Sequence, residues 1–225
     1  SNFTAMKEIS AMLQREWLME IRSRSSVAGL LLYAIAAVYV VFLAAGKISS
    51  AEFWLAALWG NGLFVAINTT MRAFQSETSG VQLYLYTLVS PRALILSKTL
   101  YYTCLVAALN TLSLLFFLLF FGSDLPAGAS HASIFLSVLI GSAAMGSVLT
   151  FVSGLAYRAS QGMSLLAVLG FPVLMPVLLS VVKMTKAAMI SDSVVSDPYA
   201  FTITITLAIL SWVLSLVMFP YLWRD

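Results

Sequence analysis

Six long apolar runs without a charged side chain set the strongest limit on how this sequence can fold. They lie near residues 27–45, 53–71, 99–121, 134–157, 163–182 and 200–222. About 20 residues of α-helix cross the hydrocarbon core of a bilayer, which matches the length of these runs. The runs also lack the polar–apolar alternation that is typical of membrane β-strands. The sequence therefore predicts an all-α integral membrane protein, built as a six-transmembrane-helix bundle.

The composition excludes a water-soluble domain. Of the 225 residues, 61% are hydrophobic and 9% are charged, whereas soluble domains carry about 25% charged residues. The net charge of +3 is too small and too scattered to indicate nucleic-acid binding. The single cysteine, Cys104, excludes an internal disulfide and a thiolate metal cluster. We therefore expect membrane lipid around the chain, with no nucleic acid partner and no metal site.

The basic residues predict how the chain is oriented in the membrane. In a six-span topology, nine of the twelve lie on one side of the bilayer: Lys7, Arg15, Arg22, Arg24, Arg72, Arg92, Lys98, Arg158 and Arg224. The other side holds Lys47, Lys183 and Lys186. Because Lys and Arg accumulate in cytoplasmic loops, we expect both termini in the cytoplasm.

The first 26 residues differ from the rest of the chain. Apolar residues recur there at helical spacing: Met6, Ile9, Leu13, Trp17 and Ile21. Charged residues fall elsewhere around the same helix: Lys7, Glu8, Arg15, Glu16 and Arg22. The pattern favours an interfacial helix on the cytoplasmic membrane surface, although a helix cap that faces water is the alternative. We therefore divide the chain into an interfacial helix over residues 1–26 and a six-span domain over residues 27–223.

A second amphipathic helix is expected between the second and third runs. Ser79 can cap a helix that begins near Gly80, and Glu77 lies where the helix dipole favours an anion. Apolar residues then follow at helical spacing: Val81, Tyr84, Leu85 and Leu88. The Ser90–Pro91 pair ends this helix before the third run. The helix is either a lever that docks onto a cytoplasmic partner or a connector that lies on the membrane.

Several segments resemble the CcmB family, the membrane permease subunit of the cytochrome c maturation ABC transporter, often called the haem exporter. The similar segments are residues 74–80, 88–91 with Lys98, 14–25, 139–155 and 158–162 followed by Pro172 and Pro176. The family's Ala-Lys pair is Ser97-Lys98 here, and its acidic cluster is reduced to Glu77. The order of these segments along the chain, from about residue 14 to residue 182, carries the resemblance.

The resemblance implies a permease of the ABC-2 type in the cell inner membrane, with a cytoplasmic coupling helix after the second span. The residues that would contact an ATPase subunit are Glu77, Ser79, Gly80, Val81, Tyr84, Leu85, Leu88 and Pro91. Other cytochrome c maturation membrane proteins and a homo- or hetero-oligomeric core are the further expected partners. Haem is the candidate cargo, although such a complex could instead release a haem chaperone. The alternatives are an ABC-2 type permease for another lipid or amphiphile, and a membrane scaffold protein without transport.

The chain is not expected to be an enzyme. It has no G-x-x-x-x-G-K-[ST] phosphate-binding loop, so the ATP that drives an ABC-type complex would be bound by a separate chain. An intramembrane serine hydrolase needs a serine with a histidine or lysine inside the membrane, but His131 lies in a predicted outer loop. We therefore assign no catalytic residue, and the sequence identifies no cofactor-binding residue.

Within the runs, neutral polar residues and small residues are the candidates for helix packing. The neutral polar residues are Asn61, Asn68, Asn110, Thr69, Thr70, Thr111 and Ser113, for which hydrogen bonds between helices are favoured over a polar lining. Small residues recur every four positions at Ser142, Gly146, Thr150 and Gly154, and predict a close contact with another helix. That contact is expected inside the chain, with a permease–permease contact as the alternative. Pro172 and Pro176 predict a kink, with a hinge as the alternative.

Overall fold

The computed structural model describes residues 2–22, 24–46, 50–75, 89–122, 125, 129–158, 162–191 and 193–222. Its helices are α1 (Asn2–Arg22), α2 (Arg24–Ala45), α3 (Ala51–Thr70), α4 (Arg72–Gln75), α6 (Pro91–Phe121), α7 (His131–Arg158), α8 (Gly162–Ser191) and α9 (Pro198–Leu222). No strand occurs within these ranges. The prediction of an all-α chain is confirmed.

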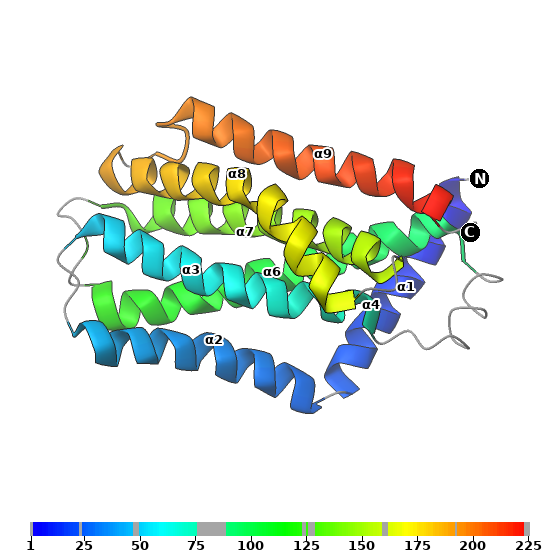
Figure 1. Cartoon of the computed structure of the whole chain (residues 1–225), viewed down its shortest axis with the longest axis horizontal. Coiled ribbons are helices and arrows are strands. Elements are labelled where there is room, and N and C mark those ends of the chain that lie inside the picture. Colours follow the sequence, from blue (N-terminus) through cyan, green and yellow to red (C-terminus); the bar gives the residue numbers. More distant parts are fainter. Residues whose placement is uncertain are drawn as a thin grey trace.

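The long helices form one bundle with α6 and α7 at its centre. Helix α6 packs against α1, α2, α3, α7 and α9, and helix α7 packs against α3, α4, α6, α8 and α9. Figure 1 shows α2 and α9 at opposite edges of the bundle, and α1 lying obliquely at the end where both chain termini lie. The main core is apolar and joins α2, α3, α6, α7 and α8 through residues such as Val38, Trp59, Phe117, Met145 and Val181.

Five of the helices are long and apolar enough to cross a membrane. The qualifying stretches are Ala28–Ala45, Pro91–Phe121, His131–Ala156, Gly170–Ser191 and Pro198–Met218. Helix α3 covers the predicted second span, but it carries Asn61, Asn68, Thr69 and Thr70 and is not among these stretches. Since α3 packs against α2, α6, α7 and α8, most of its polar residues face protein and not lipid. Because five stretches qualify and α3 is not one of them, the count of six spans stays a prediction.

Two helices extend beyond the predicted apolar runs. Helix α6 begins at Pro91 and not near residue 99, because proline fits the first turn of a helix, where its missing N–H group is not needed. Ser90 just before it is extended, with φ −66° and ψ 140°. Helix α8 continues to Ser191, past Lys183 and Lys186. A helix of 31 residues is about 46 Å long, so α6 is longer than the hydrocarbon core and its charged first turns can lie outside it.

Hydrogen bonds between side chains tie the helices together inside the bundle. Trp59 Nε1 donates to Thr185 Oγ1 at 3.2 Å, Asn110 Nδ2 to Ser142 Oγ at 3.1 Å, Thr204 Oγ1 to Ser180 Oγ at 3.0 Å, and Ser211 Oγ to Ser147 Oγ at 3.0 Å. Ser153 Oγ donates to the Thr70 carbonyl oxygen at 3.0 Å. Asn68, Thr69 and Thr70 instead donate to carbonyl oxygens of their own helix. Asn110 therefore makes the expected bond between helices, while Asn68 does not.

At the opposite end from the termini, an exposed ion pair joins α3 to α8. Lys186 Nζ lies 2.7 Å from Glu52 Oε1, and this hydrogen bond is the main reason that the pKa of Glu52 lies below its ordinary value of 4.5. A lowered pKa means that the pair contributes stability at neutral pH and that this contribution is lost as the pH falls through the pKa of the folded state.

Glu52→Gln is expected to lower the melting temperature slightly at pH 7 and not at all in acid below that lowered pKa. The effect is small because both side chains are exposed and water screens their attraction. Paired thermal melts of the wild type and the variant, in one detergent at several pH values, measure it. A difference in melting temperature that grows towards acid pH would contradict this assignment.

Candidate functional site

Helix α1 contacts the bundle through a face that includes a carboxylate. Met12 and Glu16, one turn apart, are 4% and 2% exposed, whereas Trp17 and Ile21 are 57% and 49% exposed. The predicted apolar stripe therefore does not form the contact: Ile9 and Leu13 are only half-buried, and its last two residues point away from the protein. A charge can occupy the buried face only if another charge meets it there.

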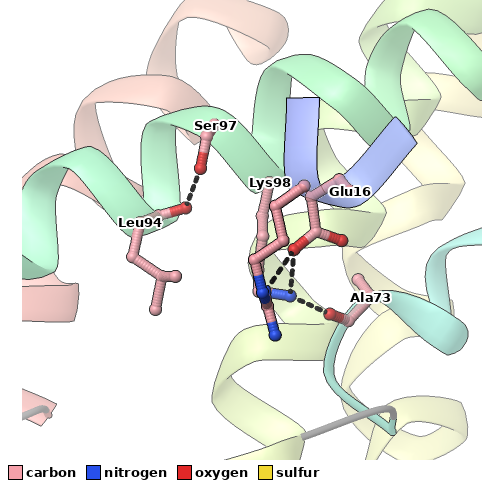
Figure 2. A network of polar contacts seen from close by, with 6 residues as sticks. Glu16, Ala73, Leu94, Ser97 and Lys98 are labelled. Carbon is pink, nitrogen blue, oxygen red and sulfur yellow. Dashed lines mark hydrogen bonds and ion pairs between the residues drawn. The ribbon is translucent and has the colours of Figure 1, made fainter. Parts of the chain in front are cut away.

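Lys98 provides that charge from the second turn of α6. Its side chain is 0% exposed, and its Nζ atom lies 3.2 Å from Glu16 Oε1. Figure 2 shows Lys98 between Glu16 and the backbone of Ala73, whose carbonyl oxygen accepts a hydrogen bond from Nζ at 2.5 Å. Nζ also lies 5.1 Å from the centre of the Phe74 ring. The ammonium group is thus surrounded by a carboxylate, a carbonyl oxygen and an aromatic face, which together replace water.

Arg15 completes the ion cluster on the water side. Its Nη1 atom lies 3.2 Å from the same Oε1 atom of Glu16, and its side chain is 26% exposed. The carboxylate of Glu16 therefore has two cationic partners. Removal of Lys98 would leave this carboxylate with Arg15 beside it.

A second contact joins α1 to the start of α6. Glu8 Oε2 accepts hydrogen bonds from Ser90 Oγ at 2.8 Å and from the Ser90 backbone N–H at 3.4 Å. Glu8 and Glu16 lie about two turns apart on the same side of α1. We call the set Glu8, Glu16, Ala73, Ser90 and Lys98 the α1 clasp. Ala73 belongs to α4 just before residues 76–88, and Ser90 and Lys98 lie just after them, so the α1 clasp holds both flanks of that segment.

A protein-family comparison decides the family. The model of the family described as CcmB protein matches residues 7–221. The chain belongs to the CcmB family. No curated protein matches it. The matched residues include the whole α1 clasp of this CcmB-family chain. They also include all eight predicted ATPase-coupling residues, which lie between positions 77 and 91.

In this CcmB-family chain, most of the predicted ATPase-coupling residues lie outside the described residues. These are Glu77, Ser79, Gly80, Val81, Tyr84, Leu85 and Leu88. Pro91 is described and is the first residue of α6. The structure adds Glu16 and Ser90 to this region and shows Lys98 as a buried residue. A lone lysine just before a long apolar run, opposite a helix with two acids on one side, is the sequence signal that could have identified the pair.

Two of the four predicted packing residues of the CcmB-family chain lie at the contact between α6 and α7. Ser142 accepts the hydrogen bond from Asn110. A Cβ atom on Gly146 would lie 3.0 Å from the backbone of Thr103 and 3.2 Å from Val106, so this glycine lets the two helices approach closely. The other two positions, Thr150 and Gly154, are buried on the same helix.

The remaining predicted positions lie away from the α1 clasp. Pro172 and Pro176 lie inside α8, and the first part of that helix, yellow in Figure 1, runs obliquely to the rest. His131 is the first residue of α7 and is exposed. Among the residues that the structure describes, no group of three or more His, Cys, Asp or Glu side chains is placed to hold a metal ion.

Proposed function

We propose that this chain is the permease subunit of an ABC-type complex, in which a separate ATPase subunit hydrolyses ATP and pushes on residues 76–88. Membership of the CcmB family and the five apolar helices support a role within the membrane. The α1 clasp is the observation that carries the mechanism, because it connects both flanks of the pushed segment to α1 and α6.

Helix α3 is the sixth span in this proposal. It is 20 residues long and runs between the two ends of the bundle, packed against α2 and α6. An even number of crossings returns the chain to the side on which it started, which agrees with both termini lying at one end in Figure 1. Enclosure by neighbouring helices explains how a span with two asparagines can be accommodated in a membrane.

The end of the bundle that carries the α1 clasp is placed in the cytoplasm. Arg15, Arg22, Arg72 and Arg92 belong to helices at this end, whereas Lys183 and Lys186 lie near the other. This asymmetry follows the preference of basic residues for the cytoplasmic side. An ATP-driven subunit must also be on that side, and the exposed Trp17 and Ile21 of α1 would rest in the membrane interface there.

The α1 clasp would transmit a displacement of residues 76–88 to the membrane helices. Lys98 is fixed to α6 by the backbone and to α1 and α4 by its ammonium group. A displacement of residues 76–88 would therefore move the first turns of α6 together with α1, and α6 contacts most of the other helices. The cargo step would belong to cytochrome c biogenesis, either as haem export or as release of a haem chaperone, with other membrane proteins of that pathway in the complex.

The double variant Glu77→Lys, Leu85→Asp is expected to release the ATPase subunit from the chain. A reversed charge and a new carboxylate in an apolar contact together should weaken binding at least about tenfold, which corresponds to about 1.4 kcal/mol. Co-purification of the ATPase from membranes, quantified against the amount of inserted permease, measures the loss.

Glu52→Lys is the matched control, because it reverses an exposed carboxylate at the opposite end of the bundle. It should leave the ATPase bound at the wild-type level. Retention of the ATPase by the double variant, with normal insertion, would disprove the proposed coupling.

A further inference from the structure

Buried polar atoms without a hydrogen bond are concentrated on two helices. Among the described residues they are Trp54 Nε1, both amide atoms of Asn61, Thr99 Oγ1, Tyr101 OH, Thr103 Oγ1, Asn110 Oδ1, Thr111 Oγ1 and Ser113 Oγ. All of them lie on α3 or α6, and within the described ranges none lies on α7, α8 or α9. Unpaired groups of this kind are costly in a membrane interior, so their restriction to α3 and α6 calls for a functional explanation.

Two of these unpaired atoms line a small pocket between α3, α6 and α7. Its walls are Leu58, Trp59, Gly62, Asn110, Ser113 and Val138. Asn110 and Ser113 are 2% and 1% exposed. The amide nitrogen of Asn110 is bound to Ser142, which leaves the amide oxygen unpaired. The gaps between these side chains are too narrow to hold a water molecule.

Gly62 lets α3 lie close to Asn110, because glycine has no Cβ atom. A Cβ atom at Gly62 would lie 3.4 Å from the amide nitrogen and oxygen of Asn110. A small movement of α6 away from α3 would therefore widen the pocket at its polar wall. Helices α3 and α6 are also the long helices on either side of residues 76–88, on which the proposed function places the ATPase.

The lining determines which chemical group could bind. It contains no charged side chain, which disfavours a metal ion or an inorganic anion. It offers one unpaired amide oxygen and one hydroxyl beside the apolar surfaces of Trp59, Leu58 and Val138. The indole N–H of Trp59 is already bound to Thr185, so its ring provides only an apolar wall. A hydroxyl, an amide or an un-ionised acid on an apolar body complements this surface.

We propose that this pocket is the closed form of a site for the uncharged hydrogen-bonding group of an amphiphile that crosses the membrane between α3 and α6. The proposal rests on the permease function. Ser113 lies 15 positions after Lys98 on α6, or about 22 Å along the helix axis. The site is therefore deep in the bundle, far from the α1 clasp that would open it.

Thiol modification in membrane vesicles that contain the ATPase-bound chain tests whether the pocket opens. Ser113→Cys and Leu114→Cys are compared in a Cys104→Ser background, since Cys104 is itself exposed. Residues 113 and 114 are equally buried neighbours, but only Ser113 lines the pocket. A cysteine thiolate attacks the sulfenyl sulfur of 2-aminoethyl methanethiosulfonate, forming a mixed disulfide and releasing methanesulfinate, so rapid modification reports a hydrated site. We expect modification at position 113 to be at least about tenfold faster during ATP hydrolysis, which corresponds to about 1.4 kcal/mol.

Dodecanol tests whether the open pocket binds a hydrogen-bonding amphiphile, and dodecane is the matched apolar control. Dodecanol should slow the modification at position 113 several-fold, and Asn110→Leu should abolish that protection. Equal protection by dodecane, or equal rates at positions 113 and 114, would overturn the proposed site. If the ATPase co-purifies and those rates are equal, only the site is wrong. If no ATPase co-purifies with the wild-type chain, the permease function is wrong whatever the rates.

Discussion

Glu16→Leu is expected to lower the free energy of unfolding by about 3–5 kcal/mol, the usual effect of removing one member of a buried ion pair. The variant removes the carboxylate that lies 3.2 Å from the ammonium group of Lys98, which is 0% exposed and also contacts the Ala73 carbonyl oxygen and the Phe74 ring. Unfolding of the purified chain in mixed micelles, followed by circular dichroism as denaturing detergent is added, measures the loss.

Lys98→Met is the informative comparison, because it leaves a different charge behind. Arg15 still lies 3.2 Å from Glu16 Oε1, so the carboxylate keeps a cationic partner and the loss should be smaller. The combined Glu16→Leu, Lys98→Met variant should recover most of the stability, since both members of the buried pair are then replaced by apolar residues. If the two single effects simply add in the double variant, the ion pair does not contribute as described.

Gly141→Ala is expected to destabilise the chain by about 1–3 kcal/mol, although alanine normally favours a helix. The added Cβ atom would lie 2.5 Å from Val181 Cγ1 and 2.7 Å from Trp59 Cη2. Neither neighbour can easily turn away, because valine is stiff at χ1 and the indole is bound to Thr185. The helices α3 and α8 would have to move apart from α7, and the melting temperature in detergent should fall accordingly.

Gly60→Ala is the matched control for this prediction, since no atom lies within 4 Å of the position of its Cβ atom. There the same substitution should stabilise the chain by about 0.5–1 kcal/mol, because alanine loses less backbone freedom on folding than glycine does. Adding Val181→Ala to Gly141→Ala should restore part of the loss by removing the closer contact. Equal melting temperatures for Gly141→Ala and Gly60→Ala would show that α7 does not pack against Trp59 and Val181 as described.

The helical class could be predicted from the sequence because the length of an apolar run is a local property. The ends of α6 and α8 could not, because a helix can continue past the hydrocarbon core wherever the protein outside it offers contacts. A related reason applies to α3, the predicted second span. The sequence of a run that contains Asn61 and Asn68 does not show whether its neighbours are lipids or helices. In the structure, α3 packs against α2, α6, α7 and α8.

The candidate site was predicted only in part, because its decisive contact is not local. Glu16 and Lys98 are 82 positions apart, and each alone resembles a charge that faces water. The helical spacing of apolar residues on α1 predicts a stripe on the membrane surface, and it gives no sign that Glu16 turns towards the protein to meet Lys98. Asn110 was predicted as a residue that bonds another helix, but nothing in the sequence selects Ser142 as its partner.

The separation of Glu16 and Lys98 also affects how the protein is made. At about 5–20 residues per second, Lys98 is synthesised about 4–16 s after Glu16, because the two are 82 positions apart. During that interval α2 and α3 are synthesised while the carboxylate on α1 has no Lys98 to meet. A nascent chain released before residue 98 cannot form this contact. The ion pair between α1 and α6 can therefore form only after residue 98 has been synthesised.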